Sequence, residues 1–378
     1  MATPHTIQHH FRKLKDPRLN RLKLHLLPDI IVIALCAVLC GAKNWQQVET
    51  FGKQRLAWLR RFLKLPNDIP SHDTFERVFD RIDPRAFHQS FQNWVAAIAE
   101  TLDIQHIAID GKTLRGSGSN KLGPLHLVSA WATEQHLSLG QVATAEKSNE
   151  ITAIPELLDL LELHGAIVTI DAMGCQKAIA SKIIEREGDY LLMVKENQPT
   201  LFEDIENAVG QALESDFQGI KHDQHSTEDR GHGRTERRHY TILIDPPGLT
   251  QKDQWESLRV VGMCVRERQV GTAKPTMAVS YFIGSKVMSA KRYGKALRNH
   301  WGIENNLHWH LDVSFSEDAN RVTERNGAEN LALLRKLALM MLKRHPSKQS
   351  LTGKQWNAAL NPQFLENVLL ANANPDKI

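Results

Sequence analysis

The sequence predicts a mixed α/β fold with a β-rich insertion, preceded by an all-α region. Three observations support this prediction. Apolar residues recur at helical spacing over about the first hundred residues. From about residue 103, short β-branched runs follow the order three strands, helix, strand, helix, strand. Strand-like segments then return within about 216–286. This order fits a mixed sheet better than a doubly wound one.

The composition is that of an ordinary globular protein. The chain has 378 residues, of which 42% are hydrophobic and 24% charged. Its four cysteines form no CxxC pair, so we expect reduced thiols and a cytoplasmic protein. The longest apolar run, residues 30–40, is about half the ~20 residues that a bilayer requires, so no membrane partner is expected.

Residues 1–102 are expected to form an N-terminal helical region that binds DNA. An apolar run at 29–41 indicates a buried helix, and 70–74 (PSHDT) has the residues of a helix start before a second one. A further helix is expected from residue 84. Basic segments occur here and elsewhere in the chain, a distribution that suits a long polyanion, although each can also be a solvated helix face. Spacing alone does not assign a helix-turn-helix motif.

Residues 103–346 are expected to form a second, mixed α/β domain, and 347–378 a C-terminal tail. Within the domain, the insertion at about 216–286 separates the last sheet strand from the helix at Glu304. The other expected strands are 106–111, 126–133, 137–145, one ending at Asp171, 190–195, and in the insertion 240–245, 258–264 and 277–283. The other expected helices are 152–163, 176–187, 199–214 and 323–345.

Three carboxylates lie in or directly after apolar runs, where a charged side chain is unusual. Asp110 and Asp171 each end a short apolar strand. Glu304 shares a helical face with residues expected in a core, namely Leu297, Trp301, His308 and Leu311. A buried charge is costly unless it is paired or binds a metal. Together the three acids can hold two Mg²⁺ ions, or Mn²⁺ in their place, for phosphodiester chemistry.

Several motifs together resemble the DDE transposases of bacterial insertion sequences, in the H-repeat-associated (ISAs-type) branch. They are IDGKTLRGS at 109–117, TIDAMG at 169–174, KENQ at 195–198, GHGRTERR at 231–238, NHWGIEN at 299–305 and LHWHLDV at 307–313. The resemblance covers about residues 10–345. It implies an RNase H-like catalytic domain with Asp110, Asp171 and Glu304 as the metal-binding triad.

The resemblance further implies a DNA partner and a higher-order complex. The expected partners are the terminal inverted repeats of the element, target DNA, and further copies of the chain in a homodimer or larger oligomer. Bound protein would be associated with the nucleoid. A metal-dependent nuclease that does not join DNA, or an inactive DNA-binding descendant, are the alternatives.

One departure from the family pattern concerns the residues that handle phosphate. Tyr293 and Arg298 precede Glu304 at different spacings from the family's Tyr and Arg, and Leu311 occupies the position of its Lys. Lys295, Arg298 or His300 can substitute. The remaining candidates for DNA contact are Lys112, Arg115, Lys195, Arg234, Arg237, Arg238 and His308.

For three single residues and one group of histidines, the sequence leaves more than one interpretation. Asp312 is the second choice for the third acid. His308 either contacts the water shell of the metal or is a hydrogen-bonded core histidine. Trp301 is expected in the core, with base stacking as the lesser alternative. A zinc site at His222, His225 and His232 is disfavoured because no cysteine accompanies them.

Overall fold

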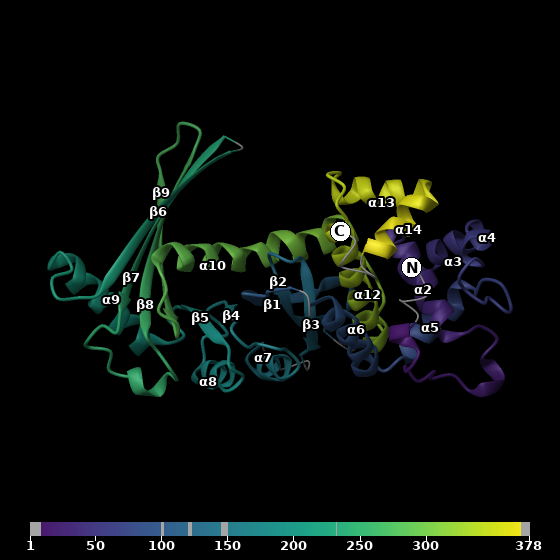
Figure 1. The fold of residues 1–378 in the computed structure, drawn as a ribbon, viewed down its shortest axis with the longest axis horizontal. Coiled ribbons are helices and arrows are strands. Elements are labelled where there is room, and N and C mark those ends of the chain that lie inside the picture. The colour runs from purple at the N-terminus through teal and green to yellow at the C-terminus, as the bar shows by residue number, and fades with distance from the viewer. Residues whose placement is uncertain (1–8, 100–101, 120–122, 145–149, 232, 372–378) are drawn as a thin grey trace. The chain divides into compact units, whose positions relative to one another are not determined.

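A computed structural model describes residues 9–99, 102–119, 123–144, 150–231 and 233–371 (Figure 1). The chain divides into two compact units. Unit 1 contains Met1–Ile104, Gly111–Lys147 and Ile303–Ile378, and unit 2 contains Gln105–Asp110 and Ser148–Gly302. The chain therefore passes between the units four times. One passage lies within a single strand, directly after Asp110, and the last lies between Gly302 and Ile303, just before Glu304.

Unit 1 is mainly helical and is organised around two buried helices. Helix α2 (Leu27–Leu39) is apolar on every side, and α12 (Arg325–Arg344) packs against α2, α5 and α6. An all-round apolar helix is stable only inside a core, which explains why the run at 30–40 does not need a membrane. The other helices of the unit are η1 (Asn20–Leu22), α3 (Trp45–Gln54), α4 (Leu56–Leu59), α5 (His72–Arg81), α6 (Pro84–Ala99), η2 (Arg115–Ser117), the π-helix η4 (Glu304–His308), α11 (Trp309–Val313), α13 (Leu351–Leu360) and α14 (Pro362–Ala371).

The C-terminal region, expected to be a tail, contains two packed helices. Helices α13 and α14 pack on each other, and α14 contacts α12. Leu365, Val368 and Leu369 of α14 are buried. Unit 1 also contains the antiparallel hairpin of β2 (Leu125–Ala132) and β3 (Leu137–Ala143), in the strand order β3-β2-β1.

Unit 2 is built on a mixed sheet. Its parallel part consists of β1 (His106–Leu114, whose first residues belong to this unit), β4 (Ile167–Ile170) and β5 (Asp189–Val194). Helices α7 (Glu150–Asp159) and α8 (Lys177–Glu185) lie on one side of these strands in Figure 1, and α10 (Ala290–Ile303) lies on the other. Tyr293 and Ala296 of α10 pack in a core with residues of β5, β7, β8 and β9.

The insertion extends the same sheet. Strands β6 (His222–Gly231), β7 (Arg234–Ile244), β8 (Val260–Val270) and β9 (Thr276–Gly284) follow helix α9 (Pro199–Glu214) and pair antiparallel. Because β9 pairs with β5, the strand order in unit 2 is β1-β4-β5-β9-β8-β7-β6. The structure is thus a mixed α/β fold with a β-rich insertion and an N-terminal helical region, which confirms the predicted mixed α/β class.

Candidate active site

Asp110 and Asp171 are neighbours at one edge of the sheet of unit 2. Strands β1 and β4 are parallel, with Ile109 opposite Ile170, and the next residue along the chain in each case is an aspartate. Both carboxylates are half-buried. Asp171 therefore follows the end of β4, as expected, whereas Asp110 lies in the middle of β1, which continues to Leu114 and does not end at the aspartate.

The backbone that follows β4 fixes the orientation of the Asp171 carboxylate. Its Oδ1 accepts hydrogen bonds from the N–H groups of Met173 (3.1 Å) and Gly174 (3.3 Å). Burial raises the pKa of Asp171, and the negative charge of Glu150 adds to this effect, whereas the two hydrogen bonds and Lys195 oppose it. An acid that burial disfavours as an anion gains stability from a bound cation.

A pocket of about 720 Å³ opens beside Asp171, and residues 195–197 form part of its wall. Asn197 donates from Nδ2 to the carbonyl oxygen of Ala172 (2.7 Å), and Gln198 donates from Nε2 to that of Cys175 (2.9 Å). These two amides therefore hold both ends of the loop that follows Asp171. This gives the KENQ motif a structural role that the sequence did not suggest.

Helix α10 is connected to β4 by a buried polar chain. The Thr169 hydroxyl lies 3.1 Å from Nδ1 of His300 and 3.0 Å from Nε2 of His106. All three side chains are buried. Burial lowers the pKa of His300 to about 4, so its ring is neutral near pH 7. His300 is therefore a buried partner of Thr169.

Glu304 belongs to unit 1 and begins the π-helix η4. Its side chain is exposed, whereas Leu307 and Leu311 are fully buried and His308 is half-buried. Trp301, expected in the core, is 37% exposed. The guanidinium groups of Arg238 and Arg266 lie 5.6 and 5.5 Å from the centre of its ring, within the range of cation–π interactions.

The cations proposed to contact DNA fall into two groups. Lys112 and Arg238 are buried in ion pairs: Lys112 with acids at 312–318 (described below), and Arg238 with Asp229 and Glu236. Burial opposes the charge of Lys112, but Glu317, Asp312 and Asp318 outweigh it and raise its pKa. Neither cation is presented to a phosphate. The exposed candidates are Arg115, Lys195, Arg234, Arg237, Lys295 and Arg298, of which Arg115, Arg237 and Arg298 also pair with acids.

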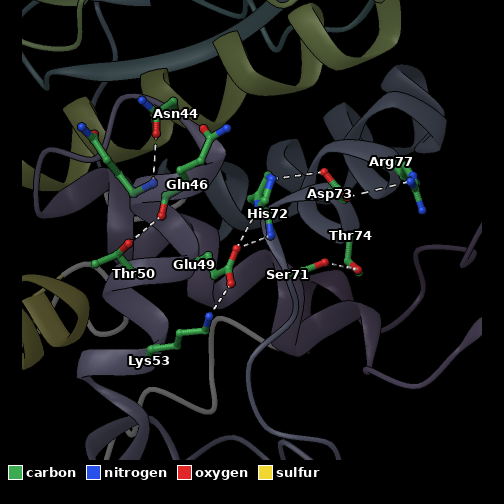
Figure 2. Close-up of polar contacts among 11 residues, drawn as sticks. Asn44, Gln46, Glu49, Thr50, Lys53, Ser71, His72, Asp73, Thr74 and Arg77 are labelled. Carbon is green, nitrogen blue, oxygen red and sulfur yellow. Dashed lines mark hydrogen bonds and ion pairs between the residues drawn. The ribbon is translucent and has the colours of Figure 1, made fainter.

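Helices α3 and α5 of unit 1 carry a group of polar side chains (Figure 2). Glu49 of α3 accepts hydrogen bonds from the backbone N–H (2.7 Å) and Nδ1 (2.8 Å) of His72, the first residue of α5. The hydrogen bond from Lys53, followed by those from His72, lowers the pKa of Glu49 to about 2. This carboxylate thus caps α5 and fixes it to α3. Gln46, Thr50 and Arg77 remain exposed on the two helices.

The donors at the sheet edge suit Mg²⁺ or Mn²⁺. Such ions take hard oxygen ligands and often use only one or two carboxylates, completed by water and substrate phosphates. Asp110 and Asp171 supply that number. Within the part of the chain that the structure describes, no three His, Cys, Asp or Glu residues come together as a metal site. His222 and His225 accordingly form no zinc cluster there, and His232 lies outside the described residues.

The fold and the acid pair define a mixed α/β protein with two carboxylates side by side on neighbouring parallel strands. Sequence comparison is more specific. A profile described as "DDE_Tnp_1-associated" matches residues 8–95, and one described as "Transposase DDE domain" matches residues 101–341. No helix among the described residues is long and apolar enough to cross a membrane.

Full-length relatives agree with these profiles. The chain is 42% identical to "Putative transposase YncI" of Escherichia coli O157:H7, over 91% of this chain and 89% of the relative. It is 38% identical to "H repeat-associated putative transposase YhhI" of Escherichia coli K12, over 96% and 97% respectively. The chain therefore belongs to the DDE transposase family, in its H-repeat-associated branch, and is an enzyme of that class.

A solved structure of a piggyBac transposase synaptic complex with hairpin DNA is also similar. The TM-score is 0.42 and the sequence identity 10%, over 97% of this chain and 81% of the other.

Proposed function

We propose that this chain binds the ends of its own insertion sequence and catalyses their cleavage and transfer to target DNA. Asp110, Asp171 and Glu304 are the proposed catalytic acids. The observation that supports the proposal is the β1–β4 register, which makes the two aspartates neighbours directly after the paired residues Ile109 and Ile170. Glu304 is proposed as the third acid for two reasons. It lies in the motif NHWGIEN, which resembles that of the family, and its side chain is exposed.

The three carboxylates would hold two divalent cations. When bound, Mg²⁺ or Mn²⁺ lowers the pKa of the attacking water or 3′ hydroxyl and stabilises the leaving 3′ oxygen. The protein supplies orientation. Two backbone N–H groups fix the Asp171 carboxylate, and Asn197 and Gln198 hold the loop behind it. Since water and then the freed 3′ hydroxyl act as nucleophiles, no Ser, Tyr or Cys is required for a covalent intermediate.

Double-stranded DNA is the proposed partner. Exposed Lys195 lines the pocket beside Asp171, where a scissile phosphate would need a cation. Lys295 is exposed on α10 and Arg234 on β7, and both suit backbone phosphates. The surface of α3 and α5 would bind the terminal repeats. We further propose that the DNA complex contains two or more copies of the chain and forms in the cytoplasm.

The test is a cleavage and strand-transfer assay on DNA that carries the ends of the element, with Mg²⁺ or Mn²⁺. Asp110→Asn, Asp171→Asn and Glu304→Gln should each bind DNA like the wild type but lower cleavage and joining at least 1,000-fold. Glu203→Gln, an exposed glutamate of α9, is the matched control. If Glu304→Gln keeps full activity and Asp312→Asn loses it, Asp312 would be the third catalytic acid instead of Glu304. Cutting without joining would indicate a nuclease, and binding alone an inactive descendant.

A further inference from the structure

Lys112 lies at the centre of a cluster of acids within unit 1. Its Nζ lies 2.7 Å from Oδ1 of Asp312, 3.0 Å from Oδ1 of Asp318 and 3.4 Å from Oε2 of Glu317. Lys112 is two residues after Asp110 on strand β1. Asp312 is eight residues after Glu304, on helix α11, which continues directly from the π-helix. One ammonium group thus connects the strand of the first acid to the helical segment of the third.

The cluster differs from an ordinary surface ion pair. Only 10% of the Lys112 side chain and 1% of the Glu317 side chain are exposed. Isolated surface pairs contribute little, but a buried cation shared by several carboxylates cannot be removed without leaving buried charge unpaired. The geometry of this attachment therefore depends on the ammonium group itself.

The backbone supports the same attachment. The N–H of Arg115 donates to Oδ1 of Asp318 (3.4 Å). At Gly116 an added Cβ would overlap the carbonyl oxygen of Asn320 and crowd that of Asp318. The segment after β1 and the segment after α11 are therefore in direct contact, and only a glycine permits this approach.

We propose that Lys112 is a positioning residue that holds the helical segment carrying Glu304 against the part of β1 that follows Asp110. It does so by binding Asp312, Glu317 and Asp318, and it contacts neither substrate nor DNA. The role follows from the geometry, because the ammonium group is fully occupied by carboxylates and lies on the same strand as Asp110. This inference rests on the proposed function, in which Glu304 completes the acid triad.

Iron-directed cleavage of the full-length protein tests the arrangement without any need for activity. Fe²⁺, used in place of Mg²⁺ with ascorbate and hydrogen peroxide, produces radicals that cut the polypeptide near the bound ion. Wild type should be cut near Asp110, Asp171 and Glu304. In Lys112→Met the cuts near both aspartates should persist, while those near Glu304 fall at least fivefold. Lys112→Arg, which keeps the charge, should restore them.

The outcomes separate the two proposals. Absence of cuts near Glu304 in the wild type would overturn the triad itself. Wild-type cuts at all three acids that persist in Lys112→Met would overturn only the positioning role. If Lys112→Met does not fold, as judged by circular dichroism, Asp318→Asn replaces it. That variant removes one of the three partners and should give the same loss near Glu304 to a smaller degree.

Kinetics distinguish positioning from phosphate contact. A misplacement of about 1 Å can lower a rate roughly 100-fold, so Lys112→Met should lower the cleavage rate by about that factor at saturating DNA. DNA affinity and its salt dependence should not change. A lysine that contacts a phosphate would instead weaken binding and reduce the salt slope by about one. Lys291→Met, at an exposed position of α10, is the control. A reduced slope in Lys112→Met alone would overturn the proposal.

Discussion

The hydroxyl of Thr169 lies 3.1 Å from Nδ1 of His300, and this contact joins strand β4 to helix α10. Thr169 precedes Asp171 by two residues, and His300 precedes Glu304 by four. Because Nε2 of His106 lies 3.0 Å from the same hydroxyl, one threonine satisfies two buried imidazoles. The contact belongs wholly to unit 2, whereas the Lys112 cluster belongs wholly to unit 1. The helical segment around Glu304 is therefore attached on both sides of that residue.

Replacing Thr169 with valine should destabilise the protein. The change keeps the side-chain shape but leaves two buried ring nitrogens without this partner, at about 1–3 kcal/mol for each unsatisfied group. The free energy of unfolding, measured by urea denaturation, should fall by about 2 kcal/mol or more. Thr200→Val, at an exposed position of α9, should change it by less than about 0.5 kcal/mol. Equal effects of the two substitutions would contradict the structural role of Thr169.

Replacing Asn197 with alanine should lower the rate of DNA cleavage more than the affinity for DNA. The variant loses the 2.7 Å hydrogen bond to the carbonyl of Ala172, directly after Asp171. A loosened loop misplaces the acid, and we expect a cleavage rate about 10- to 100-fold lower at saturating DNA. Glu196→Ala alters the exposed preceding residue and is the matched comparison. Loss of affinity with an unchanged rate would instead identify Asn197 as a DNA contact.

Gly116→Ala should destabilise the contact between the ends of β1 and α11. The added methyl group would overlap the backbone of Asn320, which cannot move as easily as a side-chain tip. Such overpacking typically costs about 1–3 kcal/mol. Gly123→Ala is the control, because no atom lies within 4 Å of its added Cβ. Thermal unfolding of the two variants should show a lower midpoint for Gly116→Ala only.

Stability should fall as the pH decreases from about 6.5 towards 4, in part because of His88. Its Nε2 accepts a hydrogen bond from the backbone N–H of Gln141 (3.1 Å), so the folded state requires a neutral ring. Burial, with Lys336 second, lowers the pKa of His88 from 6.5 to about 4. The unfolded chain therefore takes up a proton first. The stabilising contribution is complete above pH 6.5 and is lost below it, by up to about 3 kcal/mol.

His88→Gln isolates this effect, since an amide oxygen can accept the same hydrogen bond without titrating. The free energy of unfolding of the variant should depend less on pH between 6.5 and 4 than that of the wild type. Burial also lowers the pKa values of His300 and His310 to about 4, so the stability of the variant should still depend on pH through these two residues. His164→Gln removes an exposed histidine and should leave the slope unchanged. An unaltered slope in His88→Gln would contradict the prediction.

The aspartate pair could be predicted from the sequence because its geometry is local. A short β-branched run has few options besides a buried strand, and two such strands in parallel bring the residues that follow side by side. The continuation of β1 past Asp110 to Leu114 was not predicted. The residues that hold the pair could not be predicted in the same way. Lys112 beside Asp110 suggested a phosphate contact, because its acidic partners lie about 200 residues later in the chain. Only the folded structure shows that its charge is already neutralised.

Strand β6 and Trp301 show two further limits of sequence patterns. The sequence of β6, HDQHSTEDRG, has no apolar face and was not expected to form a strand. Its pairing with β7 along its whole length satisfies the backbone, and the position at the edge of the sheet tolerates polar side chains on both faces. Trp301 fitted an apolar helical face, but two arginines from β7 and β8 lie over its ring.

The π-helix at Glu304–His308 makes the spacing between Glu304 and Asp312 unusually sensitive to chain length. A π-turn spans i to i+5 and is equivalent to one residue inserted into an α-helix. Deleting a single residue there would restore α-helical winding and turn everything beyond it by roughly 100°. Asp312 would then face away from Lys112 while Glu304 kept its place. Within this stretch, a one-residue deletion should therefore be more harmful than most substitutions.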